Sequence, residues 1–110
     1  MATERMRRVN EVMREVVGEA IASELDDPRI GFVTVTAVET RPDLRSARVF
    51  VSVLGDERER DSTMAALNAA HGILQAAVNR ELRLKRTPTL KFVYDDTLER
   101  AQRLSDLLDR

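Results

Sequence analysis

Two adjacent carboxylate pairs and one histidine are the side chains of this sequence that could support catalysis. Asp26–Asp27 and Asp95–Asp96 could hold Mg²⁺ for phosphodiester cleavage, and His71 could act as a general base. A two-metal site usually needs about three or more converging acids, and no third acid stands at a suitable spacing. Neither a G-x-S-x-G nucleophile motif nor a glycine-rich phosphate loop occurs. We therefore expect a protein that is not an enzyme, with a magnesium-dependent ribonuclease as the alternative.

Composition excludes several other kinds of site. The 110-residue chain has no cysteine, and its one histidine cannot form a multi-histidine metal site, so no metal or other cofactor is expected. No apolar run approaches the roughly 18 to 20 residues that cross a bilayer. The charged N-terminal segment also lacks the apolar region of a signal peptide. We expect one cytoplasmic domain over residues 1–110, with no membrane partner.

Arginine dominates the positive charge, since all but two of the 18 cationic residues are arginine. A planar guanidinium group pairs with two phosphate oxygens at once, so phosphate binding is one explanation; codon or thermal bias is the other. The cations gather in two segments and the acids elsewhere, so the formal net charge of −1 conceals a basic face. The candidate phosphate-binding residues are Arg5, Arg7, Arg8, Arg80, Arg83, Lys85, Arg86 and Lys91.

These side chains must be positioned by a mixed set of helices and strands. Apolar residues at three- and four-residue steps predict helices, and β-branched or alternating runs predict strands. The predicted order is helix 3–25, strands 31–40 and 46–54, helix 63–83, strand 89–95 and a final helix that begins at Asp96 or Thr97. The first two strands are joined by a short turn and form an antiparallel hairpin. This order predicts a two-layer α+β domain in which a three-stranded sheet packs against helices.

The connections in this order carry further expectations. Residues 55–61 are highly charged and are predicted to form a loop, with Asp61 or Ser62 as the cap of the next helix. Because the helix 63–83 connects the second and third strands, these strands can lie parallel or span the sheet. The final helix is expected to turn its apolar side chains inward. These are Leu98, Ala101, Leu104, Leu107 and Leu108.

Gly72 lies in the middle of the predicted helix 63–83, where a glycine costs helix stability. It follows Ala69, Ala70 and His71. One explanation is a kink at which small side chains let another backbone come close. The other is close packing of the helix against the sheet.

Several sequence pieces together resemble one family over nearly the whole chain. The pieces include Asp27-Pro28-Arg29-Ile30-Gly31 at the end of the first helix, the turn segment 42–49, and Ala70-His71-Gly72. Arg86-Thr87-Pro88, followed by Leu90 and Phe92, resembles a C-terminal signature. Each piece is weak alone, but their order and spacing are specific. The chain is similar to the ribosome-binding factor A family, whose members are bacterial factors for assembly of the small ribosomal subunit.

The resemblance implies a type II KH-like domain of order α-β-β-α-kink-α-β, followed here by a short C-terminal helix. Ala70-His71-Gly72 would be the A-x-G kink that replaces the G-x-x-G loop of other KH domains, so the helix 63–83 would break near Gly72. The resemblance also implies a monomer that binds the immature small (30S) subunit and its 16S rRNA, and that aids late maturation and rRNA processing without catalysis. The kink residues and the candidate cations would then contact RNA. An interaction module that dimerises through its first helix is a further alternative.

Three positions depart from the family pattern. Gln75 stands after the kink where a basic residue is frequent, Thr89 stands where glutamate is usual, and Ala101 replaces a glycine in the last helix. These departures concern local contacts around the kink and the C-terminal signature.

Overall fold

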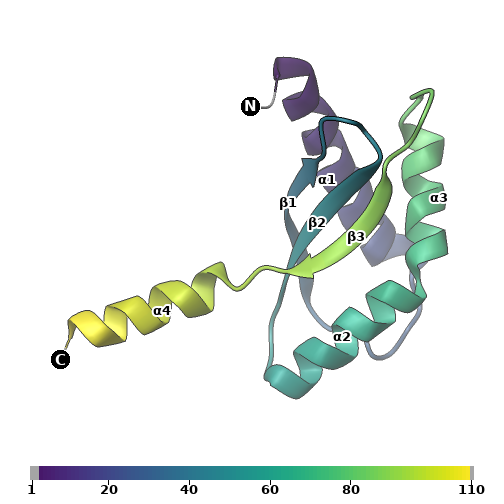
Figure 1. Ribbon diagram of the computed structural model, residues 1–110. Coiled ribbons are helices and arrows are strands. Elements are labelled where there is room, and N and C mark those ends of the chain that lie inside the picture. Colours follow the sequence, from purple (N-terminus) through teal and green to yellow (C-terminus); the bar gives the residue numbers. More distant parts are fainter. Residues whose placement is uncertain (1–2, 110) are drawn as a thin grey trace.

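The computed structural model, which describes residues 3–109, has strand β2 (Ser46–Val53) at the centre of its sheet. Every second side chain of β2 is buried, which confirms the alternation predicted from the sequence. Strand β1 (Val33–Thr40) pairs with β2 antiparallel and β3 (Thr89–Tyr94) pairs with it parallel, in the order β1-β2-β3 (Figure 1). The predicted hairpin is therefore confirmed. Of the two arrangements open to the third strand, the structure has the parallel one.

Helix α1 (Glu4–Glu24) lies behind the sheet in the view of Figure 1, and α3 (His71–Glu81) packs beside it. The start of α1 is set by Thr3, whose hydroxyl accepts a hydrogen bond from the Met6 amide (3.1 Å). The apolar stripe of α1 is buried in the protein's own core. A dimer through this helix would therefore have no free apolar stripe to use.

The core lies between these helices and one face of the sheet. Its large, fully buried side chains include Met13, Val17, Val49, Val51, Leu67, Leu74, Val78 and Leu90. The other face of the sheet is open, and its middle row crosses the three strands as Glu39, Arg48 and Lys91. Packing in the core thus holds the helices against one face of the sheet, and the row Glu39, Arg48 and Lys91 faces outward on the other.

Helix α2 (Glu57–Ala69) begins earlier than the sequence predicted, so the predicted loop 55–61 and the caps Asp61 and Ser62 were wrong. The cap is Asp56, whose carboxylate accepts from the Glu59 amide (2.8 Å), while the Glu59 carboxylate accepts from the Asp56 amide (3.4 Å). This reciprocal pair stabilises a first turn that is polar on all sides. Apolar periodicity does not detect such a turn.

The chain breaks between α2 and α3 at Ala70 (φ −89°, ψ 10°), so two helices replace the single helix predicted over 63–83. A helix break in this region is what the family resemblance implied. Gly72 lies in the first turn of α3, and a Cβ built there would meet nothing within 4 Å. Tight packing within residues 3–109 therefore does not explain this glycine.

Helix α4 (Thr97–Leu108) does not pack on the body, so the predicted inward orientation of its apolar side chains was wrong. It extends away from the sheet in Figure 1, and Leu98 and Leu108 are 76% and 75% exposed. Ala101, Leu104 and Leu107 are exposed as well. The reason is that α1 and α3 already cover the buried face of the sheet. The two-residue link after β3 leaves little length for a return.

Hydrogen bonds at Asp95 hold the start of α4. The Asp95 carboxylate accepts from the Thr36 hydroxyl (2.6 Å) and from the Thr97 amide (3.0 Å), and its own amide donates to the Val51 carbonyl (2.7 Å). The hydrogen bonds from Thr36 and then Thr97 keep the pKa of Asp95 below its usual range. Thr36 is the bulged residue of β1. The bulge therefore places the Thr36 hydroxyl where it can bond to Asp95, just before the first turn of α4.

No helix within residues 3–109 has the length and apolarity needed to cross a bilayer.

Candidate nucleic-acid interface

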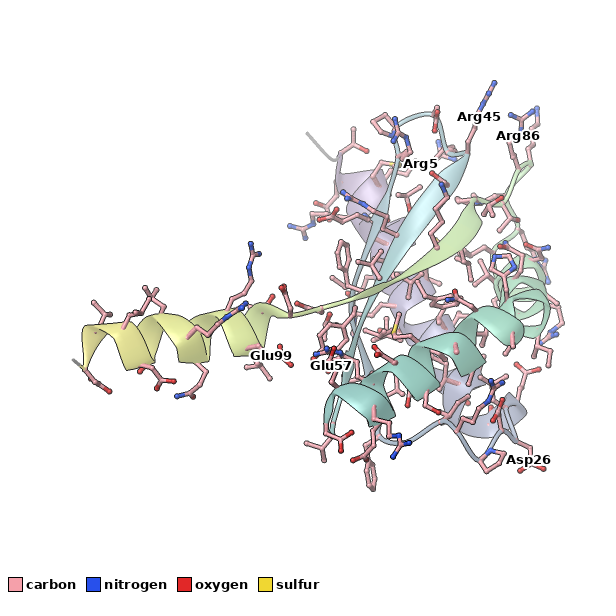
Figure 2. The ribbon with its side chains drawn as sticks, turned by 60° about the horizontal axis from the view of Figure 1, so that its bottom comes forward. Arg5, Asp26, Arg45, Glu57, Arg86 and Glu99 are labelled. Carbon is pink, nitrogen blue, oxygen red and sulfur yellow. The ribbon has the colours of Figure 1, made fainter. Side chains whose placement is uncertain are left out.

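Two loops lie side by side at one end of the molecule. They are the turn 41–45 between β1 and β2 and the segment 82–88 between α3 and β3. The Thr89 amide donates a hydrogen bond to the Arg45 carbonyl (3.0 Å), which joins the two loops. Figure 2 shows Arg5, Arg45 and Arg86 gathered at this end. We call this region the basic end; it comprises Arg5, Arg41, Arg45, Arg83, Lys85 and Arg86, all of which are exposed.

The six cations of the basic end have no ion pair with another residue in the range 3–109, whereas other candidate cations do. Arg7 and Arg8 lie 3.6 and 3.8 Å from the Glu4 carboxylate. Both pairs are exposed and weak, so the two arginines stay available to a ligand. Arg80 is held more closely, since its guanidinium donates to both oxygens of Glu24 at 3.1 Å.

Lys91 lies on the open face of the sheet rather than in a loop. It lines a groove of about 390 Å³ together with Arg41, Arg48 and the β1–β2 turn. The Arg48 guanidinium is paired with Glu39 at 2.7 Å, so its charge is locally balanced. The groove connects the basic end to the middle of the open face.

The kink residues lie at the other end of α3 from the loop 82–88, about 16 Å away along an 11-residue helix. His71 is half-buried, with Nε2 2.9 Å from the Leu90 carbonyl and its ring edge-on to Phe92. Ala70 is half-buried and Gly72 is exposed. The structure therefore does not bring the kink residues and the basic loop together, and RNA contact at the kink stays a prediction.

Gln75 joins α3 to the start of β3. Its amide nitrogen donates to the Pro88 carbonyl (2.9 Å), and its amide oxygen accepts from the Leu90 amide (2.9 Å). Leu90 is almost fully buried and β3 is an edge strand, so this amide depends on the Gln75 side chain. Two structural hydrogen bonds thus hold the Gln75 side chain between α3 and β3.

Replacing Gln75 with lysine is expected to lower the free energy of unfolding by about 1–3 kcal/mol, because lysine offers no acceptor to the Leu90 amide. Thermal or urea unfolding measures this loss. Asn79→Ala, which removes only the exposed amide contact of Gln75, is the control and should cost no more than about 0.5 kcal/mol. Equal stability of Gln75→Lys and the unchanged protein would contradict this role.

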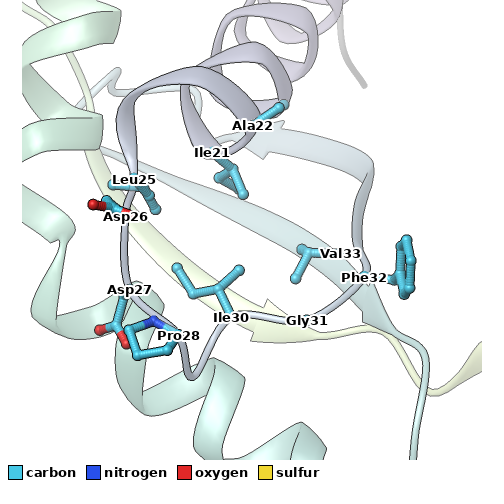
Figure 3. A pocket seen from close by; sticks show the side chains of 11 residues that line it. Ile21, Ala22, Leu25, Asp26, Asp27, Pro28, Ile30, Gly31, Phe32 and Val33 are labelled. Carbon is cyan, nitrogen blue, oxygen red and sulfur yellow. The ribbon is translucent and has the colours of Figure 1, made fainter.

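The opposite end of the molecule is acidic. Asp26 and Glu57 lie far from the three labelled arginines of the basic end in Figure 2. A hollow of about 430 Å³ occurs here, and Ile21, Ile30 and Val33 point into it while Phe32 points away (Figure 3). Its rim carries Asp26 and Asp27, so it does not suit a phosphate group.

One member of each carboxylate pair considered for catalysis, Asp27 and Asp95, is engaged in local hydrogen bonds. The Asp27 carboxylate accepts from the Arg29 guanidinium (2.7 Å) and from the Arg29 amide (2.9 Å), and these bonds lower its pKa. Asp95 is bonded to Thr36 and Thr97, as described above. Residues 3–109 contain no group of at least three His, Cys, Asp or Glu side chains placed to hold a metal ion.

Sequence reasoning missed Arg41 and Arg45 as candidate cations. They flank the turn residues Pro42-Asp43-Leu44, and the sequence pattern connected this segment with a turn and with the family resemblance but not with binding. Their position on either side of a hairpin turn was a signal that both would be exposed. Their proximity to residues 83–86 follows only from the parallel pairing of Ser46 with Thr89.

The chain is similar to proteins of one family along its length. A family model described as ribosome-binding factor A matches residues 5–108. A curated ribosome-binding factor A of Halothermothrix orenii is 43% identical over 110 residues, which is 100% of this chain and 90% of that protein.

Solved structures of the same family match the fold. The crystal structure of ribosome-binding factor A from Thermus thermophilus matches with a TM-score of 0.72 and 29% identity, over 81% of this chain and 93% of that one. A homology model of the Thermus thermophilus factor, fitted into a cryo-EM map of a complex with the 30S subunit, matches with a TM-score of 0.66 and 30% identity, over 79% and 91%.

Proposed function

The chain belongs to the ribosome-binding factor A family, and we propose that it binds the immature small (30S) ribosomal subunit through 16S rRNA. Its α+β fold is KH-like, with the helix break at Ala70 in the place of the KH loop. We propose further that it acts as a single RNA-binding domain and as a monomer. Its binding aids late maturation and processing of 16S rRNA.

The observation that supports this function is the basic end. Six cations on three separate chain segments lie there without ion pairs within residues 3–109, and the loop 82–88 contains no acidic residue. Phosphate contacts of this kind position a protein on RNA without reading its sequence. A basic surface that surrounds one end of a compact domain therefore fits the backbone of a folded RNA.

Binding alone is sufficient for a role in assembly. A protein that binds one conformation of a folding RNA more tightly than another shifts the RNA population toward the first conformation. A shift from about 10% to about 90% of the preferred conformation changes the ratio of the two conformations by roughly a hundredfold, so it needs about that difference in affinity. Each factor of ten in affinity corresponds to about 1.4 kcal/mol. A handful of phosphate contacts that form in only one conformation can supply this difference.

Co-sedimentation with free small subunits and with complete ribosomes tests the function. The protein is expected to pellet with free small subunits and not with complete ribosomes. Incubation with precursor rRNA and Mg²⁺ is expected to leave the RNA uncut. Equal recovery with both particles would contradict a role in assembly, and cleavage of the precursor would contradict a non-catalytic role.

A further inference from the structure

We propose that the β1–β2 turn is a second RNA-binding element, in which Arg41 and Arg45 contact the phosphate backbone alongside Lys85 and Arg86. This inference rests on the proposed function, because it assigns a further part of the surface that holds the RNA. The β1–β2 turn is an addition to the proposed RNA-binding surface, because no sequence signal connected this turn with binding.

The turn is held in one shape by its own backbone. The Arg41 amide donates to the Ser46 carbonyl (2.9 Å), and the Leu44 amide donates to the Arg41 carbonyl (2.9 Å). Leu44 has φ 59°, a left-handed conformation that is rare for a residue with a large side chain. The Asp43 carboxylate accepts from the Arg45 amide (3.0 Å), so this acid is engaged with the backbone. A fixed turn loses little freedom when it binds.

The position of the turn connects it to the candidate cations found in the sequence. The Arg45 carbonyl accepts from the Thr89 amide, so the turn lies directly against the end of the loop 82–88. Arg41 lines the groove of about 390 Å³ that continues to Lys91 on the open face. The turn therefore lies between the loop cations and the groove that leads past the Arg48–Glu39 pair to Lys91.

RNA is a better partner for this surface than an acidic protein. Protein interfaces usually have an apolar centre with aromatic anchors. The two loops hold three leucines: Leu44 and Leu84 are half-buried, and Leu82 is buried in the core. The large exposed apolar side chains of residues 3–109 lie outside the two loops, Phe32 and the α4 leucines among them. Guanidinium groups dispersed without an apolar centre suit a repeating polyanion.

Charge reversal in the turn tests this assignment. Arg41→Glu/Arg45→Glu is expected to weaken binding to small subunits by about tenfold for each arginine and to make the salt slope shallower by about 0.7–0.9 for each. Arg58→Glu is the control, because Arg58 is exposed on α2 at the acidic end and the change places an acid in the first turn of that helix. It should change affinity no more than about twofold.

A second measurement identifies the partner, using the absence of native cysteine. Thr89→Cys carries a benzophenone label between the two loops and retains the backbone bond to Arg45; Asp26→Cys carries the same label at the acidic end as the control. We expect light to join the label at position 89, and not at 26, to RNA. Crosslinks from position 89 only to ribosomal protein would overturn the proposal.

The outcomes separate this inference from the function on which it rests. If the unchanged protein binds small subunits but the double variant binds equally well, the turn is not part of the interface, and the proposed function stands. If the unchanged protein does not bind small subunits, both proposals fail. Arg45→Gln, which removes the charge without reversing it, replaces the double variant if that variant does not fold.

Discussion

The affinity for small ribosomal subunits is expected to fall by about two to three orders of magnitude between roughly 50 and 200 mM monovalent salt. Each phosphate contact releases condensed counterions, so the logarithm of the affinity falls by about 0.7–0.9 per contact for each tenfold rise in salt. About five contacts from the basic end give this loss over a fourfold change. Sedimentation or filter binding at a series of salt concentrations measures the slope.

Salt should act on the contacts and not on the fold. Within residues 3–109 the buried side chains of the core are apolar, and the one buried polar residue, Thr63, is neutral and hydrogen-bonded to the Arg29 carbonyl (3.1 Å). Thermal unfolding over the same salt range is therefore the control and should change little. Affinity that does not depend on salt would contradict phosphate binding at the basic end.

The periodicity of apolar residues predicted the helices and strands that are determined by residues close together in the sequence. The alternation in β2 and the apolar stripe of α1 each describe one buried face, so their positions were predicted to within a few residues. The first turn of α2 was missed because the capping box at Asp56 stabilises it without apolar residues. The break at Ala70 came from the family resemblance and not from helix periodicity.

The candidate site was predicted in composition but not in arrangement. The run of cations over 80–91 reads as one cluster in the sequence, yet the structure divides it. Arg80 is paired with Glu24, Lys91 lies on the open sheet face, and Arg83, Lys85 and Arg86 remain in the loop. Arg45 joins them through a pairing between residues more than 40 positions apart in the chain. Such pairings depend on strand order, which the sequence left open.

Leu74→Ala is expected to lower the free energy of unfolding by about 2–5 kcal/mol, which is a large part of the roughly 5–15 kcal/mol typical of a domain. Leu74 has no exposed surface and lies in the core with Val17 of α1 and Val49 of β2. Removing its side chain leaves a cavity where α1, α3 and the sheet meet, and the neighbours can fill it only in part. Urea unfolding, read as a shift of the midpoint at unchanged slope, measures the loss.

Leu104→Ala is the matched control, because it removes the same atoms from a leucine that the sequence pattern also assigned to the core. Leu104 is 59% exposed on α4, so its replacement should cost no more than about 0.5 kcal/mol. A 12-residue helix without buried side chains is marginal alone, and α4 should exchange its amide hydrogens faster than α1 or α3. If Leu104→Ala costs as much as Leu74→Ala, α4 packs on the body in solution. In that case the apolar periodicity of the final helix reflects packing against the core, as the sequence pattern predicted.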